Sequence, residues 1–127
     1  MNRNEAERFA RAWIDAWNRR DIEAVLSTYA AELSFTSPTA LEVVGRATLS
    51  AKSELRSYWQ NALARIEQLE FVLDRCVWDD ASRELAIIYT RHIGESTKRV
   101  VETFRFGPDD LVVATEVLHG NVPDSGH

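Results

Sequence analysis

Two stretches of the chain repeat apolar residues at the spacing of an amphipathic helix, Glu5–Arg19 and Ser50–Gln68. The aligned residues are Phe9, Trp13, Ala16 and Trp17 in the first, and Leu55, Tyr58, Trp59, Ala62, Leu63 and Ile66 in the second, with Leu69 just beyond it. We expect each stripe to face a core or a cavity, because large aromatic rings are stabilised chiefly by burial.

Between these helices, Asp21–Pro38 changes its hydrophobic period from 3.6 residues to two. The carboxylate of Asp21 can cap a short helix, and Leu33–Ser37 then alternates like a strand. The apolar face of that helix is formed by Ile22, Val25, Leu26 and Tyr29. Regular strand pairing should stop at Pro38, which has no amide hydrogen to donate.

After Leu69 the sequence favours strands, because four segments are rich in Val, Ile, Phe and Tyr and are joined by short polar links. The segments are Glu70–Trp78, Leu85–Ile93, Arg99–Phe106 and Leu111–His119. Three helices followed by an antiparallel meander predict an α+β domain with the helices on one face of the sheet. We expect one domain over residues 1–127, in which Asn121–His127 is a flexible tail.

The composition of the chain argues against nucleic acid and membranes as partners. Acidic residues (20) outnumber basic ones (15), which gives a formal charge of −5. Such a chain, without a Lys/Arg cluster, does not favour nucleic acid as a partner. No apolar run approaches the roughly 20 residues that cross a bilayer, and the charged first residues do not resemble a signal peptide. We therefore expect a soluble cytoplasmic protein that binds neither nucleic acid nor membrane.

The order of these elements resembles the nuclear transport factor 2-like superfamily, which includes ketosteroid isomerase and the SnoaL-like cyclases. The resemblance covers almost the whole chain: a Trp-rich helix, an Asp-Ile-Glu-Ala helix, a strand ending in Ser-Pro, a Gly-Arg turn, a long helix, and a meander with Glu-Thr-Phe-Arg-Phe at 102–106. It implies a cone-shaped, curved, mostly antiparallel sheet with three helices on its concave face, enclosing a pocket. It also implies that no cofactor is needed.

Ketosteroid isomerase combines a carboxylate base with a tyrosine and a protonated aspartic acid that stabilise an oxyanion. Aligned with that arrangement, the base is replaced by Ser37 and the tyrosine by Trp13. Only the second acid has a counterpart, Glu102. The resemblance therefore implies the fold but disfavours steroid isomerisation.

Glu102 sets the face of the sheet that we expect to line the pocket. Alternation along its own strand selects Val100, Phe104 and Phe106. By resemblance, the neighbouring strands contribute Ile88, Thr90, His92, Val113, Thr115 and His119. We expect Glu102 and either His119 or His92 to act as acid and base, because burial raises the pKa of a carboxyl group and a nearby histidine lowers it. The expected ligand contacts are Trp13, Trp17, Ser37, Tyr58, Trp59, Thr90, Phe104 and Thr115.

Each assignment has a structural alternative. A strand register shifted by one residue would pair Glu102 with Arg91 or Arg105. The helical tryptophans and tyrosine occupy core spacing, and both histidines lie near strand ends, where solvent exposure is common. A triad of Ser37, His119 and Glu102 would lack a nucleophile-elbow signature.

The sequence predicts neither a metal nor a cofactor. The three histidines, of which one is His127, have no HExxH-type spacing, although His92, His119 and Glu102 could form a facial triad. The five glycines form neither a GxGxxG nor a Walker pattern.

Two functions fit these patterns. The first is a cofactor-independent isomerase, cyclase or dehydratase that acts on a small apolar carbonyl compound. The second is a non-catalytic module that binds a small molecule or assembles as a dimer. An open cavity in which Glu102 meets a histidine favours the enzyme, and an interior filled by side chains favours the module.

The opposite face of the sheet predicts a homodimer. Apolar residues also occupy the other strand parity, and the helices are already assigned to the first face. A second copy of the chain is the simplest cover, since a two-fold axis lets one patch satisfy itself. The expected contacts are Ile87, Tyr89, Ile93, Val101, Thr103, Val112, Ala114 and Leu118, surrounded by Arg99, Arg105 and Glu116.

Overall fold

The structure is a computed structural model that describes residues 1–124. Four helices and six strands occur within these residues. In chain order they are α1 (Arg3–Asn18), α2 (Ile22–Leu26), β1 (Tyr29–Thr36), α3 (Pro38–Val44), β2 (Thr48–Ala51), α4 (Lys52–Ala64), β3 (Leu69–Asp79), β4 (Glu84–Ile93), β5 (Ser96–Phe106) and β6 (Val112–Gly120).

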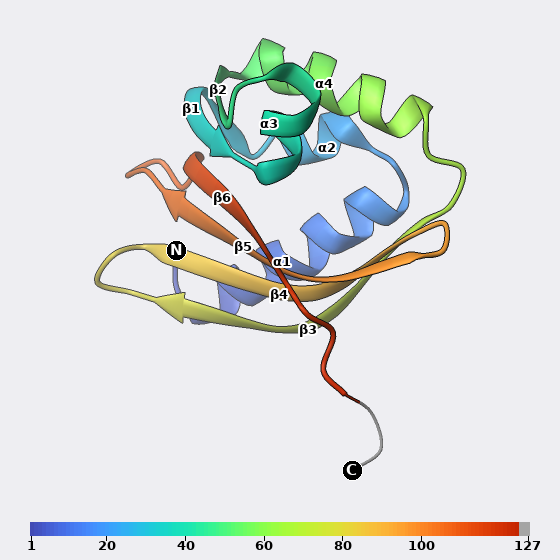
Figure 1. Ribbon diagram of the computed structural model, residues 1–127. Helices are drawn as coiled ribbons and strands as arrows, with labels where there is room; N and C mark the ends of the chain where they lie inside the picture. Colours follow the sequence, from blue (N-terminus) through green and yellow to red (C-terminus); the bar gives the residue numbers. More distant parts are fainter. Residues whose placement is uncertain (125–127) are drawn as a thin grey trace.

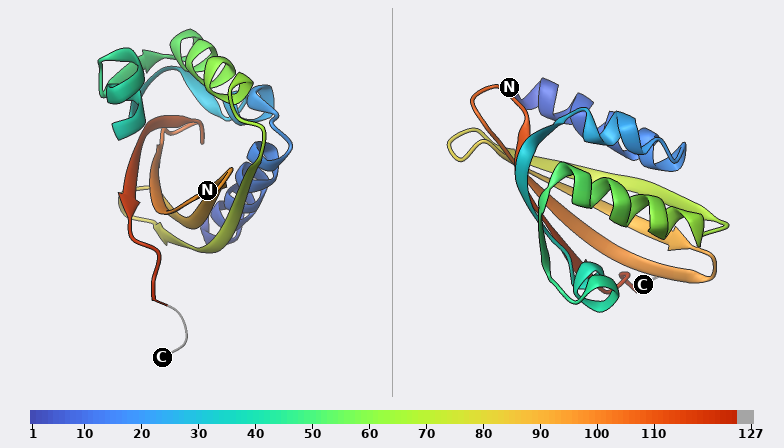
Figure 2. Two further views of the ribbon diagram at one scale, coloured as in Figure 1. Left: turned by 45° about the vertical axis from the view of Figure 1, so that its right-hand side comes forward. Right: turned by 90° about the horizontal axis from the view of Figure 1, so that it is seen from above.

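The strands form a single six-stranded sheet in the order β2-β1-β6-β5-β4-β3. Its pairs are antiparallel except β1 with β6, which run parallel. The sheet is strongly curved but not closed, and α1 and α4 lie over its concave side (Figures 1 and 2). The predicted α+β fold with a curved, mostly antiparallel sheet is confirmed.

Helix α1 is fixed at both ends by side-chain hydrogen bonds. Asn2 and Glu5 form a capping box at its start. At its end, the Asn18 amide donates to the carbonyl of Phe71 (2.9 Å) and its oxygen accepts from the Phe71 amide (2.7 Å). Asn18 thus satisfies part of the free edge of β3, which holds the tryptophan stripe of α1 against the sheet.

The stretch from Tyr29 to Ala51 differs from the sequence prediction. Tyr29 begins β1 instead of lying on the preceding helix, and helix α3 and strand β2 were not expected. Ser37 ends the strand and caps α3, Pro38 occupies its first turn, and Gly45 closes it with φ +77°. These residues are common at the start and end of helices. Pro38, which was expected only to end the strand, therefore also begins helix α3.

Helix α4 is shorter than the predicted Ser50–Gln68, because Ser50 and Ala51 pair in β2 and the helix ends at Ala64. Leu63, Ile66 and Leu69 still share one side, where they line a cavity described below.

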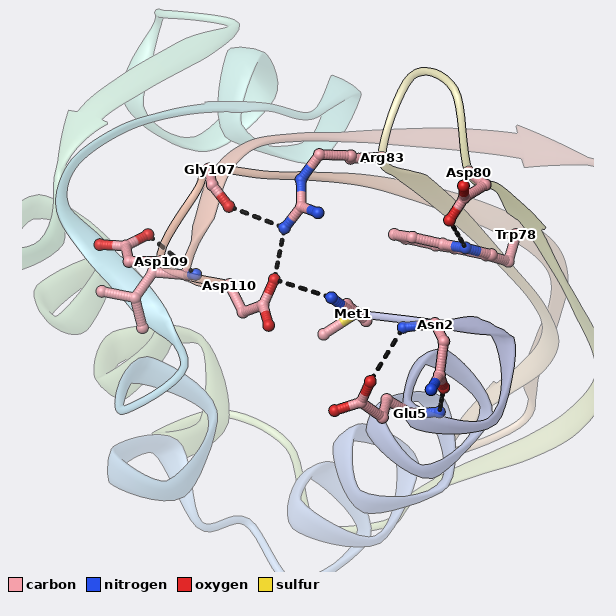
Figure 3. A network of polar contacts seen from close by, with 10 residues as sticks. Met1, Asn2, Glu5, Trp78, Asp80, Arg83, Gly107, Asp109 and Asp110 are labelled. Atoms are coloured by element: carbon pink, nitrogen blue, oxygen red, sulfur yellow. Dashed lines mark hydrogen bonds and ion pairs between the residues drawn. The ribbon is translucent and has the colours of Figure 1, made fainter.

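One end of the sheet is closed by a polar network around the β3–β4 and β5–β6 turns (Figure 3). Asp110 pairs with Arg83 and accepts from the amino group of Met1 (3.3 Å), while Arg83 also donates to the carbonyl of Gly107 (3.0 Å). The β4–β5 turn, Gly94-Glu95, lies at the other end of the sheet.

No helix within residues 1–124 is long and apolar enough to cross a membrane. Of the predicted tail, 121–124 are exposed and form no helix or strand. Residues 125–127, including His127, lie outside the described part of the chain.

Candidate functional site

A cavity of about 150 Å³ lies between helices α1 and α4 and the concave face of the sheet. Its walls are mainly apolar and include seven aromatic residues: Trp13, Trp17, Phe35, Tyr58, Trp59, Phe71 and Tyr89. A cavity of this size, lined by apolar side chains, binds benzene in an engineered protein. The interior therefore has room for a ligand with a single ring.

Glu102 of β5 is the one acidic side chain among the described residues that line this cavity, and it is only 4% exposed. The Thr115 hydroxyl on β6 donates a hydrogen bond to its Oε2 (2.9 Å). Burial raises the pKa of Glu102 to about 8, and the hydrogen bond from Thr115 and a smaller effect of the Tyr89 hydroxyl only partly oppose it. Glu102 therefore holds its proton at neutral pH.

Two buried phenols surround this acid. Burial raises the pKa of Tyr29 and of Tyr89 well above the usual value, and the proximity of Glu102 raises both further. The indole nitrogen of Trp13 donates to the Tyr29 hydroxyl (3.4 Å). No cation of residues 1–124 forms an ion pair with Glu102, so the alternative pairing with Arg91 or Arg105 is absent from this part of the chain.

His119 of β6 also lines the cavity, and its Nε2 is buried without a hydrogen-bond partner in the described residues. Burial lowers the pKa of His119, and Arg91 and Lys98 lower it further. Glu102 is opposite Val117 and His119 is opposite Val100, so the acid and the imidazole are diagonal neighbours, about 7–8 Å apart at their backbones. No hydrogen bond joins His119 Nε2 to Glu102, and both side chains line the same cavity.

The predictions for His92 and Thr90 are wrong. Glu102 is opposite Ile87, so the inward residues of β4 are Ile87, Tyr89 and Arg91. His92 lies on the other face, where its Nδ1 meets the Thr97 hydroxyl (3.1 Å). Thr90 lies there too and accepts from Arg99 (3.2 Å).

Of the other residues expected to contact a ligand, five line the cavity and two do not. Trp13, Trp17, Ser37, Tyr58 and Trp59 line the cavity. Ser37 accepts a hydrogen bond from the amide of Thr39 (3.2 Å), so its hydroxyl is engaged as the cap of α3.

Phe104 and Thr115 are not part of the cavity wall. Phe104 packs in the core against Phe9 and Trp13, and Thr115 supports Glu102 from the next strand. Val113, expected to face inward, is skipped by a β-bulge, and Val112 is buried in its place.

Sequence reasoning missed several cavity residues, notably Phe35, Phe71, Tyr89 and Arg91. A signal for two of them was present in Gly94-Glu95, a two-residue turn that pairs Ile93 with Ser96. Counting inward from that turn places Ile87 beside Glu102, and hence Tyr89 and Arg91 on the same face.

No group of three or more His, Cys, Asp and Glu residues in the described part of the chain could hold a metal ion. His92 and His119 lie on opposite faces of the sheet, which rules out a facial triad with Glu102. Among the polar groups of the cavity, the neutral carboxylic acid of Glu102 and the imidazole of His119, whose pKa is lowered, form a combination suited to proton transfer.

Comparison with known proteins identifies relatives by sequence and by structure. Residues 10–115 match the family described as the SnoaL-like domain. A SnoaL-like protein of unknown function from Burkholderia thailandensis E264 is 31% identical, with 94% of this chain and 98% of that chain covered and a TM-score of 0.85. No curated protein matches the sequence.

Two more distant structures carry enzyme names. A putative ketosteroid isomerase from Kribbella flavida is 14% identical, with 98% of this chain and 84% of that chain covered and a TM-score of 0.72. The pinacolase BvnE from Penicillium brevicompactum is also 14% identical, with coverages of 92% and 84% and a TM-score of 0.76. At this identity the likeness is one of fold.

Proposed function

The chain belongs to the SnoaL-like domain family of the nuclear transport factor 2-like superfamily, and we propose that its pocket catalyses cofactor-independent proton transfer on a small apolar carbonyl compound. The reaction would be an isomerisation, a cyclisation or a dehydration. The observation that carries the proposal is a buried carboxylic acid, with a pKa of about 8, in a cavity that also contains an imidazole nitrogen without a hydrogen-bond partner in residues 1–124.

In this mechanism Glu102 acts as the acid and His119 as the base. Protonated Glu102 donates a hydrogen bond to the carbonyl oxygen of the substrate, as a neutral carboxylic acid does in an oxyanion hole. His119 Nε2 takes a proton from the carbon next to the carbonyl, and the electron pair of that C–H bond moves towards the oxygen to give an enolate, which the hydrogen bond from Glu102 stabilises. The imidazolium then returns the proton to another carbon, or to a leaving hydroxyl group.

The lowered pKa of His119 suits this role, because a base must be unprotonated before it acts. The enzyme names of the two distant relatives support a catalytic use of this fold, though neither relative identifies the substrate.

A metabolite screen followed by two variants tests the proposal. Candidate carbonyl compounds are found by quenching of tryptophan fluorescence, since Trp13, Trp17 and Trp59 line the cavity, and are then assayed for turnover. Glu102→Gln and His119→Gln should each lower kcat by about 10²–10⁴-fold, whereas Glu116→Gln, at an exposed position on β6, should not.

The pH dependence should be bell-shaped. Activity should rise as His119 loses its proton, below the ordinary histidine range, and fall as Glu102 ionises near pH 8. Full turnover by Glu102→Gln would contradict the assignment. Ligand binding without turnover of any compound would favour the non-catalytic binding module.

We also propose that two copies of the chain pair through the convex face of the sheet. The residues expected there need correction: Ile87, Tyr89, Ile93 and Val112 face inward. Apolar residues nevertheless remain outside, including Val72 (47% exposed), Val77 (55%) and Leu118 (49%). An apolar sheet face of this kind favours a self-complementary partner.

A further inference from the structure

The open end of the cavity is cationic, although the chain as a whole carries a charge of −5. Arg91 lines the cavity and is half-buried, and Lys98 is directly opposite it on β5. Both groups lower the pKa of His119, so their field reaches the cavity. Arg91 also acts on Tyr58 and Tyr89, whose pKa it lowers.

Arg91 has no ion-pair partner within residues 1–124, in contrast to Arg46, Arg56, Arg75, Arg83 and Arg99. An acidic residue near this end of the cavity, Glu42 of α3, opposes Arg91, because it raises the pKa of Tyr58 and of His119. Its effect on His119 is the smallest of those present. A guanidinium that is half-buried and unpaired in a cavity wall is well placed to receive a carboxylate in its planar fork.

A second unsatisfied donor lies deeper in the cavity. The indole N–H of Trp17 is buried and has no hydrogen-bond partner in the described residues, and the Trp17 side chain is only 6% exposed. With protonated Glu102, the cavity therefore offers donors at several points along its length. A ligand that satisfies them must carry more than one acceptor oxygen.

These donors occur at different levels of the sheet. Glu102 is level with Ile87, and Arg91 lies four residues further along β4, about 13 Å at strand spacing. The aromatic walls lie between them. The donors that a ligand must satisfy thus lie at two ends of the cavity, Glu102 at the buried end and Arg91 at the half-buried mouth. Between them is an apolar space that accepts one ring.

We infer that the ligand is a single-ring carbonyl compound bearing a carboxylate, with its carbonyl oxygen at Glu102 and its carboxylate at Arg91. This inference rests on the proposed function for the role of Glu102, and it adds Arg91 as the residue that selects anionic ligands. Arg91 and Lys98 also attract an anion towards a mouth that the overall charge would disfavour.

Binding of a matched acid and ester tests the inference without requiring turnover. The probes are 4-acetylbenzoate and its methyl ester, in which the ring lies between the carbonyl group and the carboxylate, and the readout is tryptophan fluorescence at pH 7. The wild-type protein should bind the acid at least about tenfold more tightly than the ester, and added salt should weaken only the acid.

Arg91→Gln should weaken binding of the acid by about tenfold or more and leave the ester unchanged. Arg91→Lys should retain part of the preference, because it keeps the charge but loses the fork. Arg105→Gln, at an exposed position on β5, is the matched control and should bind both probes as the wild type does.

Equal binding of acid and ester by the wild type, failure of both to bind, or an equal loss of both in Arg91→Gln would overturn the inference. These outcomes are separate from the proposed proton transfer, which Glu102→Gln tests by turnover. If Glu102→Gln loses activity while acid and ester bind alike, catalysis stands and anion selection falls. If Arg91 selects the acid but Glu102→Gln remains fully active, the inferred placement of the carbonyl at Glu102 fails with the catalytic role.

Discussion

At the scale of single residues, Glu102 keeps its proton because the few polar groups around it only partly replace the water that it lost on folding. Thr115 supplies one hydrogen bond, and the phenols of Tyr29 and Tyr89 bring no positive charge. Arg91, the cation of the cavity wall, lies about four residues away along the sheet. A carboxyl group in such surroundings is a donor at neutral pH, which makes it useful opposite a carbonyl oxygen.

The raised pKa of Glu102 predicts how stability depends on pH. Between its unfolded pKa near 4.5 and its folded pKa of about 8, the native state holds a proton that the unfolded chain releases. The contribution of Glu102 to the free energy of unfolding is therefore fully present below pH 4.5 and is lost as pH rises through 8.

Glu102→Gln removes the titrating carboxyl group and, with it, this dependence of stability on pH. In urea unfolding at a series of pH values, the variant should gain stability relative to the wild type by a few kcal/mol between pH 5 and pH 8. Glu116→Gln controls for the change of one acidic side chain on the same sheet. A difference between Glu102→Gln and wild type that stays constant over this range would contradict a raised pKa.

At the scale of elements, the turn between β4 and β5 decides which side chains enter the cavity. A five-residue link, Gly94–Lys98, would pair Ile93 with Arg99 and bring Thr90 opposite Glu102. The two-residue turn pairs Ile93 with Ser96 instead, a shift of three residues, and an odd shift exchanges the two faces of a strand. The misplacement of His92 and Thr90 follows from this one difference.

Gly94 should be necessary for that turn. Its φ is +58°, and a side chain added there would meet nothing within 4 Å, so the cost of Gly94→Ala is conformational alone. We expect a loss of roughly 1 kcal/mol in the free energy of unfolding, measured by urea denaturation.

Gly94→Asn should lose less, because Asn tolerates positive φ better than Ala does. Gly120→Ala is the control, since Gly120 lacks a positive φ and its added carbon would only approach the carbonyl of Arg99 at 4.0 Å. Equal losses at positions 94 and 120 would show that backbone conformation is not the cause.

Helix α3 depends on Ser37 for its start. Ser37→Ala removes the acceptor of the Thr39 amide and should cost about 1 kcal/mol of stability. Ser37→Asn retains a capping oxygen and should lose less. Thermal unfolding of the two variants makes the comparison, and a stability of Ser37→Ala equal to that of the wild type would show that the cap is dispensable.

At the scale of the whole molecule, the order of helices and strands could be predicted from hydrophobic period, and the face of β5 from its alternation. Tyr29 was misplaced because it continues the apolar spacing of the preceding helix, and helix α3 was missed because Ser37-Pro38 fits the end of a strand as well as the cap and first turn of a helix. The cavity was predictable as aromatic. Its cation was missed, because the face of Arg91 depends on the register of β4 with β5, which is set by the two-residue turn Gly94-Glu95 instead of the expected link Gly94–Lys98.

Pairing of two copies through the convex face predicts a particle of twice the 14.5 kDa of the chain. Light scattering at micromolar concentration measures this directly. Leu118→Lys, placed at an exposed apolar position of that face, should shift the mass to that of the monomer, whereas Val122→Lys, beyond β6, should not. A monomeric wild-type protein would exclude the pairing.

The titration of Glu102 tests the central claim most directly, because it requires no substrate. The ¹³C signal of its side-chain carboxyl carbon, assigned by its absence from Glu102→Gln, should titrate with a midpoint near pH 8. Thr115→Val removes the hydrogen bond that lowers this pKa, so it should move the midpoint higher. A midpoint near the ordinary value of 4.5 would show that Glu102 is ionised at neutral pH and cannot act as the acid of this site.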